Sequence, residues 1–190
     1  MDLWLFRLIN GFAGHTPVVD GVMRLLVSDY LLPTIMVLTV AGLSLAGNTP
    51  TDRKPKQRIA LQAGFSLLLA NVLVKLCNLM YYRPRPFAVQ EVNLLFYHPS
   101  DSSLPSNPAA VGFSLAVAVW LTHRRPGAAL LTLAALWSLA RVYCGVHYPL
   151  DIIVGAGLGG LAAMLIVRQT PSLDRLYDRL IELGERLFVR

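Results

Sequence analysis

The chain has 190 residues, of which 55% are hydrophobic and only 15% are charged. A composition this apolar excludes an ordinary water-soluble domain and indicates a single polytopic membrane domain. The formal net charge of +6 lies in short segments between apolar stretches, which argues against nucleic-acid binding and for a role in membrane topology.

Residues 1–28 combine apolar residues with charged ones and are too polar for a definite membrane span. Leu3, Phe6 and Ile9 recur at helical spacing, which predicts a helix that lies in the membrane interface. The sequence leaves open whether residues 17–28 enter the membrane as an additional first span.

Five apolar stretches are long enough, or nearly so, to cross about 30 Å of hydrocarbon. They lie at residues 30–47, 59–80, 108–122, 127–144 and 149–167. The sequence therefore predicts an all-α transmembrane bundle of five to six spans, with the catalytic bundle over residues 30–167. In the last span, Gly155 and Gly159 have the GxxxG spacing that lets a neighbouring helix approach closely, either inside the bundle or in a dimer.

Residues 171–189 follow the last span and have the pattern of an amphipathic helix that lies on the cytoplasmic membrane surface. One face is apolar and the opposite face is charged. The apolar face comprises Leu173, Leu176, Tyr177, Leu180, Leu183 and Leu187, and the charged face comprises Arg175, Arg179, Glu182 and Arg186.

The distribution of basic residues predicts the orientation of the bundle. Of the 17 Lys and Arg residues, four lie in residues 48–58, two in residues 123–126 and five from Arg168 onward. With five spans these segments share one side, which the positive-inside rule makes cytoplasmic. Residues 81–107 and 143–149 then face the exterior, and these segments carry the candidate chemistry.

The segment ARVYCGVHYPLD places Arg141, His147 and Asp151 between two apolar stretches. An imidazole beside a carboxylate and a guanidinium is the minimum set for a histidine nucleophile that attacks a phosphoryl group. The carboxylate would fix the tautomer, the free nitrogen would attack, and the guanidinium would neutralise the phosphate oxygens. The residues alone leave open the alternative of an interfacial ion cluster that ties two helices together.

Two further segments carry groups suited to anions. In YYRPRPF, the alternating prolines stiffen Arg83 and Arg85 into an anion clamp, unless these residues form an ordinary basic membrane boundary. In PSNPA, Asn107 is predicted to cap a helix with Pro108 at its first position. The N–H groups at such a helix start can bind an anion.

Taken together, the three segments resemble the type 2 phosphatidic acid phosphatase (PAP2) superfamily of histidine-dependent membrane lipid phosphatases. The family pattern is K-x6-RP, then PSGH, then SR-x5-H-x3-D, and the resemblance covers residues 75–155. It implies that His147 is a nucleophile that forms a phosphohistidine, that Asp151 orients it, and that Arg141 binds phosphate. It also implies further phosphate-binding groups, namely Arg85, Ser106, Asn107, Lys75 and Arg83.

The chain departs from the family pattern at several positions. Ala140 replaces the serine of the third motif. If Arg85 is the family's arginine, Asn78 holds the lysine position and Lys75 lies one helical turn earlier. If Arg83 is the match, Lys75 is one residue out of register.

The largest departure is Pro108, which replaces the family histidine that protonates the leaving oxygen. Proline cannot donate a proton, so the protein is inactive, uses another acid such as His98 or Asp101, or has a leaving group that needs none. General acids contribute about 10²–10⁴-fold to the expulsion of poor leaving groups. A phosphate monoester, with a second pKa of about 6, leaves without one, which favours a lipid diphosphate substrate.

The segments LINGFAGHTPVVDGVM, RPRPF and VHYPLD resemble the bacitracin-resistance type of undecaprenyl diphosphate phosphatase. This resemblance implies a polyprenyl diphosphate substrate, action on the outer face of the bacterial cytoplasmic membrane, and recycling of a lipid carrier for the cell wall. No cofactor is expected, and the His and carboxylate spacing predicts no metal site. The alternatives are a phosphatidic acid or phosphatidylglycerol phosphate phosphatase, or a lipid-phosphate binder or carrier without catalysis.

Overall fold

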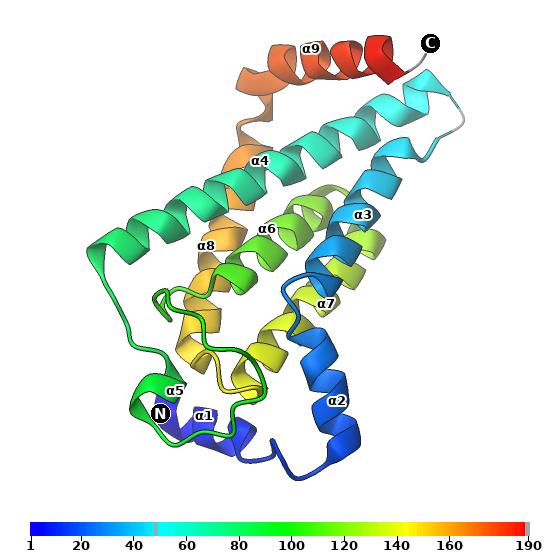
Figure 1. Ribbon diagram of the computed structural model, residues 1–190. Helices are drawn as coiled ribbons and strands as arrows, with labels where there is room; N and C mark the ends of the chain where they lie inside the picture. Colours follow the sequence, from blue (N-terminus) through cyan, green and yellow to red (C-terminus); the bar gives the residue numbers. More distant parts are fainter. Residues whose placement is uncertain (48, 189–190) are drawn as a thin grey trace.

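The computed structural model describes residues 1–47 and 49–188, and within these ranges it contains helices and loops but no β-strand. The helices of the main bundle coincide with the stretches expected to span the membrane, so the prediction of an all-α multi-pass bundle is confirmed (Figure 1). They are α3 (Leu31–Leu45), α4 (Pro50–Met80), α6 (Asn107–Thr122), α7 (Arg124–Tyr143) and α8 (Pro149–Arg168).

The helices differ in whether each is long and apolar enough to span a membrane alone. By length and apolarity, α4, α7 and α8 can each cross a membrane alone. α2 (Pro17–Leu26) and α3 pass the same test together, with a bend of 50° between them. Residues 17–28, left open by the sequence, thus include one arm of a bent helix pair. α6 is apolar but has only 16 residues.

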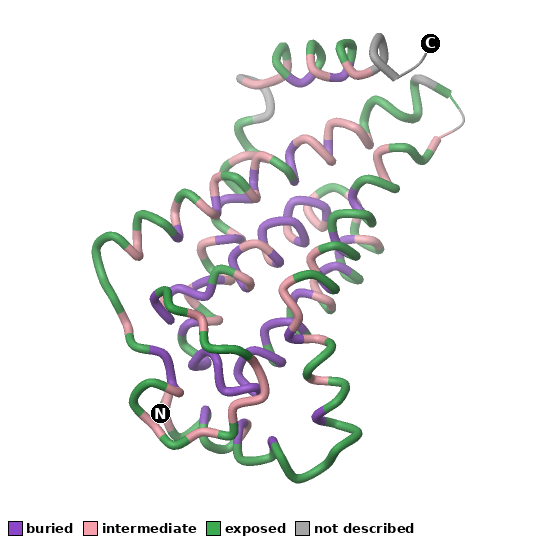
Figure 2. The backbone as a smooth tube through the Cα atoms, in the orientation of Figure 1, coloured by how far each residue is buried: buried purple, intermediate pink, exposed green. Residues whose placement is uncertain are grey.

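α6 lies at the centre of the bundle and packs against α4, α7 and α8. Figure 2 shows buried residues along α6 and in the segment that joins α7 to α8. A Cβ atom added to Gly155 would lie 2.3 Å from the Ser106 carbonyl oxygen, and one added to Gly159 would lie 2.2 Å from that of Ala110. The backbone of α8 therefore rests on α6, which confirms that the GxxxG spacing serves packing inside the bundle.

The start of α6 differs by one residue from the sequence prediction. Asn107 was expected to cap the helix, but the cap is Ser106, whose Oγ accepts a hydrogen bond from the Ala109 N–H at 3.4 Å. Asn107 is the first helical residue and Pro108 the second. The Ser106 N–H also donates to the Asp151 carbonyl oxygen at 3.0 Å, so this cap joins α6 to α8.

Two short helices, α1 (Asp2–Asn10) and α5 (Pro86–Val89), lie at one end of the bundle (Figure 1). The helix predicted from Leu3, Phe6 and Ile9 is confirmed as α1. The Phe6 ring packs against Tyr148 with 5.3 Å between centroids, and Asp2 Oδ1 accepts the Leu150 N–H at 2.9 Å. α1 is thereby fixed to the first turn of α8.

At the opposite end, α9 (Thr170–Phe188) crosses over α4 (Figure 1). Arg58 of α4 pairs with Asp174 at 2.8 Å and with Asp178 at 2.7 Å. Tyr177 is fully buried, whereas Leu176 and Leu183 of the predicted apolar face are exposed. Position 189 and the side chains of Arg186 and Leu187 lie outside the described residues.

Candidate active site

His147 lies in the tight connection between α7 and α8, and the local sequence explains its position. Gly145 has φ +81°, a conformation that favours glycine, and it turns the chain out of α7. Pro149 then starts α8, and Asp151 in the first turn accepts the Tyr148 N–H at 2.8 Å. This capping interaction fixes Tyr148, the residue before the helix start, and thereby the position of the preceding residue, His147. His147 is 1% exposed.

The two imidazole nitrogens of His147 have partners of opposite kinds. Nδ1 lies 2.9 Å from the Ser103 carbonyl oxygen, which can only accept a hydrogen bond. Nε2 lies 3.1 Å from Nη1 of Arg85, which can only donate. The ring is therefore neutral with its proton on Nδ1, and the lone pair of Nε2 points toward the Arg85 guanidinium.

Asp151 is completely buried and organises the loop around the imidazole. Its Oδ2 accepts hydrogen bonds from Ser103 Oγ and from the Tyr148 N–H, and its Oδ1 accepts from Arg83 Nη1 at 2.6 Å. Oδ2 is 3.7 Å from Nδ1 of His147. The sequence predicted that Asp151 makes the tautomer-fixing hydrogen bond; in the structure the Ser103 carbonyl makes it, and Asp151 holds Ser103.

The surroundings lower the pKa of His147. Burial, which disfavours the charged imidazolium, is the main cause; the neighbouring charges of Arg85 and Arg141 add to it, and Asp151 opposes it. The imidazole of the free protein therefore stays neutral to a lower pH than an ordinary histidine, and a neutral Nε2 is the form that can act as a nucleophile.

This lowering can be measured directly. In protein with labelled histidines, the NMR signal that disappears in His147→Gln is expected to titrate with a midpoint below 6.5, the ordinary pKa of histidine. Burial disfavours the protonated, charged imidazolium, so the pKa is shifted downward. A midpoint at or above 6.5 would mean that Asp151 outweighs burial and that His147 is charged where a nucleophile must be neutral.

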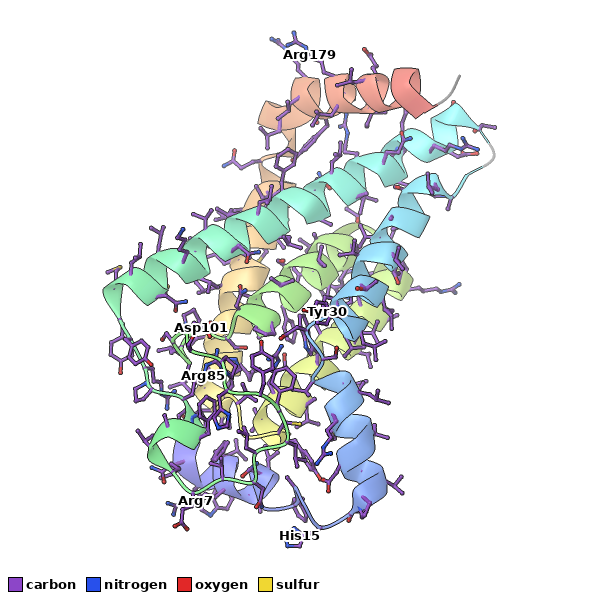
Figure 3. All side chains as sticks on the ribbon, in the orientation of Figure 1. Arg7, His15, Tyr30, Arg85, Asp101 and Arg179 are labelled. Carbon is purple, nitrogen blue, oxygen red and sulfur yellow. The ribbon has the colours of Figure 1, made fainter. Side chains whose placement is uncertain are left out.

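Two arginines flank His147, and both are held by carboxylates from outside the three motifs. Arg85 Nη2 pairs with Asp101 Oδ1 at 2.7 Å, and Figure 3 shows the two labelled side chains close together. Arg141 Nη2 pairs with Asp29, which also accepts a hydrogen bond from Tyr97 at 2.6 Å. The Nε atom of Arg141 is buried and has no hydrogen-bond partner among the described residues.

The remaining predicted residues lie at different distances from this centre. Arg83 stands behind Asp151 and also pairs with Asp2 at 2.6 Å. Ser106 is fully buried as the cap of α6, and Asn107 beside it is exposed. Lys75 lies exposed on α4, and the structure describes no hydrogen bond or ion pair for it.

Four participants were not predicted from the sequence: Ser103, Asp29, Asp2 and Tyr97. They lie in loops or at a chain end, where no periodicity marks a residue as inward-facing. The sequence feature that could have indicated Ser103 is the serine-rich run DSSLPS before α6. Among the described residues, no group of three or more His, Cys, Asp or Glu side chains is placed to hold a metal ion.

Comparison with known proteins matches the chain to a family, to two relatives and to a solved structure. The family model described as the PAP2 superfamily matches residues 59–175. The chain is 26% identical to undecaprenyl-diphosphatase BcrC of Bacillus subtilis, over 98% of this chain and 93% of that protein. It is 30% identical to the bacitracin transport permease protein BcrC of Bacillus licheniformis, over 95% and 86%. The crystal structure of Aquifex aeolicus LpxE matches with a TM-score of 0.65 and 29% identity, covering 88% of this chain and 94% of that one.

Proposed function

The chain belongs to the PAP2 superfamily, and from this we propose that it removes the terminal phosphate of a polyprenyl diphosphate, namely undecaprenyl diphosphate. The resemblance drawn from the three motifs is confirmed, and the chain is a multi-pass membrane protein of a lipid phosphatase family. The similarity to an undecaprenyl-diphosphatase over nearly the full length of both chains supports this choice of substrate.

The observation that carries the proposal is the position of Nε2 of His147, 3.1 Å from Nη1 of Arg85, a group that can only donate. Nε2 attacks the terminal phosphorus, the bond from phosphorus to the bridging oxygen breaks, and the lipid monophosphate leaves. Water then attacks the phosphohistidine and releases inorganic phosphate. Arg85 and Arg141 stabilise the charge on the phosphate oxygens, and the Nε of Arg141, which has no partner in the described part of the chain, offers a buried donor for one of them.

The diphosphate preference follows from Pro108, the second residue of α6. Loss of an alkoxide from a lipid monophosphate needs a proton, and proline has none to give. Loss of a phosphate monoester needs no proton, because its second pKa is about 6.

The proposed orientation places this site at the exterior of the bacterial cytoplasmic membrane. The site lies at the end of the bundle that carries α1 and α5, whereas the α3–α4 connection and α9 lie at the other end (Figure 1). The basic residues at the start of α4 (Arg53, Lys54, Lys56 and Arg58) and in α9 (Arg175, Arg179 and Arg186) belong to that other end, which supports a cytoplasmic position for it.

Hydrolysis of matched substrates tests the function. Purified protein is given a long-chain prenyl diphosphate and the corresponding monophosphate, each with and without a chelator. The diphosphate is expected to react at least about 10²-fold faster, which is the lower end of what a general acid contributes. Faster cleavage of the monophosphate, or of phosphatidic acid, would overturn the substrate assignment; binding of all of them without turnover would favour a carrier.

Substrate binding requires that the phosphate displace the carboxylates from the two arginines. Asp101 is the more accessible of the two, with 59% of its side chain exposed, and it touches Arg85 directly. It therefore competes with the phosphate for the same guanidinium.

The variant Asp101→Asn is accordingly expected to bind orthovanadate about threefold more tightly, because exposed ion pairs contribute up to about 1 kcal/mol. The inhibition constant measures this effect. Asp52→Asn is the matched control, since Asp52 accepts a hydrogen bond from Thr49 at the opposite end of the bundle. Weaker vanadate binding by Asp101→Asn would show that the carboxylate assists the ligand and does not compete with it.

A further inference from the structure

A groove lies between α3, α4 and α9, toward the end of the bundle opposite to the one that carries His147 (Figure 1). Its volume is about 570 Å³, within the range of about 300–1,000 Å³ that is usual for small-molecule sites. Gly64 of α4 lines the groove, and a Cβ atom added to it would meet no atom within 4 Å. The groove is therefore space that none of the described residues fills.

Polar residues line the groove at one end, and apolar residues line most of the remainder. The polar end has Arg53 and Gln57 from the first turns of α4 and Ser44 from the last turn of α3, whereas Leu67 and Leu115 belong to the apolar part. Arg53 and Leu67 are about 21 Å apart along the helix axis at about 1.5 Å per residue, and one leaflet of hydrocarbon is about 15 Å deep. This length and polarity fit a lipid of a single leaflet.

Arg53 carries the charge among the described residues that line the groove, and its side chain is held without an ion pair. Its Nε donates to the Gly47 carbonyl oxygen at 2.8 Å. No hydrogen bond or ion pair is described for its two terminal amino groups, whereas Arg58 on the same helix pairs with Asp174 and Asp178. A guanidinium with both terminal groups available can bind two oxygens of one phosphate.

The residues around Arg53 favour a ligand with net negative charge. Lys54 and Lys56 lie beside it in the sequence, and Asp52 is the one carboxylate in residues 48–58. Oδ2 of Asp52 accepts a hydrogen bond from the Thr49 hydroxyl at 2.8 Å. Basic residues near a membrane surface attract anionic lipids, and they repel the ammonium group of a zwitterionic head group.

We propose that this groove binds a phospholipid with a net negative head group, whose phosphate pairs with Arg53 and one of whose acyl chains lies along α4 toward Leu67. Leu180 and Ile181 of α9 line the same groove, so the bound lipid contacts α4 and α9 together. The lipid comes from the leaflet on the α9 side, which the proposed orientation makes the cytoplasmic leaflet. The site does not depend on the phosphatase chemistry.

Competition between two phospholipids tests the recognition of the head group. Purified protein in detergent is given equal amounts of dioleoyl phosphatidylglycerol and dioleoyl phosphatidylcholine, and native mass spectrometry compares the two one-lipid complexes. We expect a preference of about fivefold for phosphatidylglycerol, the size of effect that one basic residue near a membrane gives. Arg53→Gln is expected to abolish the preference. Arg179→Gln is the matched control, because Arg179 lies at the same end with its side chain directed away from the bundle (Figure 3).

Filling the groove tests where the acyl chain lies. Gly64→Leu puts a side chain into the open space and is expected to weaken the binding of both lipids about tenfold, the effect of losing about two buried methylene groups. Gly157→Leu is the control, since Gly157 also has no atom within 4 Å of an added Cβ but lies on α8, outside the groove. Thermal unfolding followed by circular dichroism checks that each variant is folded.

The contrary outcomes are specific. Equal binding of the two lipids by the unmodified protein, or a preference that survives Arg53→Gln, overturns the recognition of an anionic head group. Unchanged lipid binding by Gly64→Leu overturns the placement in the groove. A prenyl monophosphate that displaces phosphatidylglycerol, or a dimer that Gly64→Leu dissociates, makes the occupant the reaction product or a second copy of the chain and overturns the phospholipid. All these readouts measure binding, so failure here is distinguishable from failure of the proposed phosphatase function.

Discussion

Replacing His147 with asparagine is expected to lower the turnover of a prenyl diphosphate by about 10⁴-fold or more, the scale on which loss of a nucleophile acts in other enzymes. The asparagine amide retains a donor near Nδ1 and can still reach the Ser103 carbonyl, but it has no atom at the position of Nε2. The protein should therefore remain folded and bind phosphate while it loses the attacking atom. Phosphate release under saturating substrate measures the effect.

The matched control is His15→Asn. His15 lies at the outer edge of the molecule with its side chain directed away from Arg85 and Asp101 (Figure 3), and its Nδ1 lies 3.2 Å from the Ala13 carbonyl oxygen. Its turnover is expected to equal that of the unmodified protein. If His147→Asn retained more than about a hundredth of the activity, well above the range expected for loss of a nucleophile, His147 would not be that nucleophile.

The second large effect is expected for Asp151→Asn, which should reduce stability and turnover together. The substitution leaves Arg83 with one carboxylate partner fewer and replaces a buried acceptor of three hydrogen bonds. Breaking a buried pair costs about 3–5 kcal/mol, and the lower end applies because Arg83 is 20% exposed and keeps Asp2. Denaturant unfolding in detergent measures this loss of about 3 kcal/mol.

The effect of Asp151→Asn on kcat should exceed its effect on KM, because Asp151 holds Ser103 and Tyr148, which position the imidazole. A displacement of about 1 Å at the imidazole is enough for a loss of about 10²-fold. Asp2→Asn is the control, since it removes the partly exposed partner of the same arginine and should cost about 1 kcal/mol or less. Equal losses for the two variants would contradict the central role of Asp151 in positioning the imidazole.

Much of the fold follows from the sequence because the membrane limits the choices. Apolar stretches of the required length must be helical, since no water is available to bond their backbone groups. Gly155 and Gly159 mark the contact of α8 with α6 for a similar reason, because a side chain at either position would meet a backbone carbonyl. The spacing of Arg141, His147 and Asp151 places them around one tight turn, where the structure gathers them.

The loops could not be predicted in the same way. Asp29 reaches Arg141, Asp101 reaches Arg85 and Ser103 reaches His147. They do so through chain turns that no helical or strand periodicity determines. Nor could the spacing show that a backbone carbonyl would take the hydrogen bond expected of Asp151. Tertiary contacts between distant loops decide such details.

The position of Lys75 depends on which side of α4 faces the bundle. Ala70 and Val74 are buried one turn apart and fix which side of α4 faces the bundle. The next residue is rotated by about 100° from that side, so Lys75 projects outward and is exposed. The motif resemblance implied that Lys75 binds phosphate. The periodicity of the helix places its side chain on the exposed side of α4.

The central claim is that Nε2 of His147 becomes bonded to phosphorus, and rapid quenching of the reaction tests it most directly. Protein is mixed with prenyl diphosphate labelled in its terminal phosphate, quenched in alkali within the first turnover, digested, and its labelled peptide sequenced. The account predicts an alkali-stable, acid-labile phosphate on His147. Label on another residue, or full turnover with no protein-bound label, would contradict it.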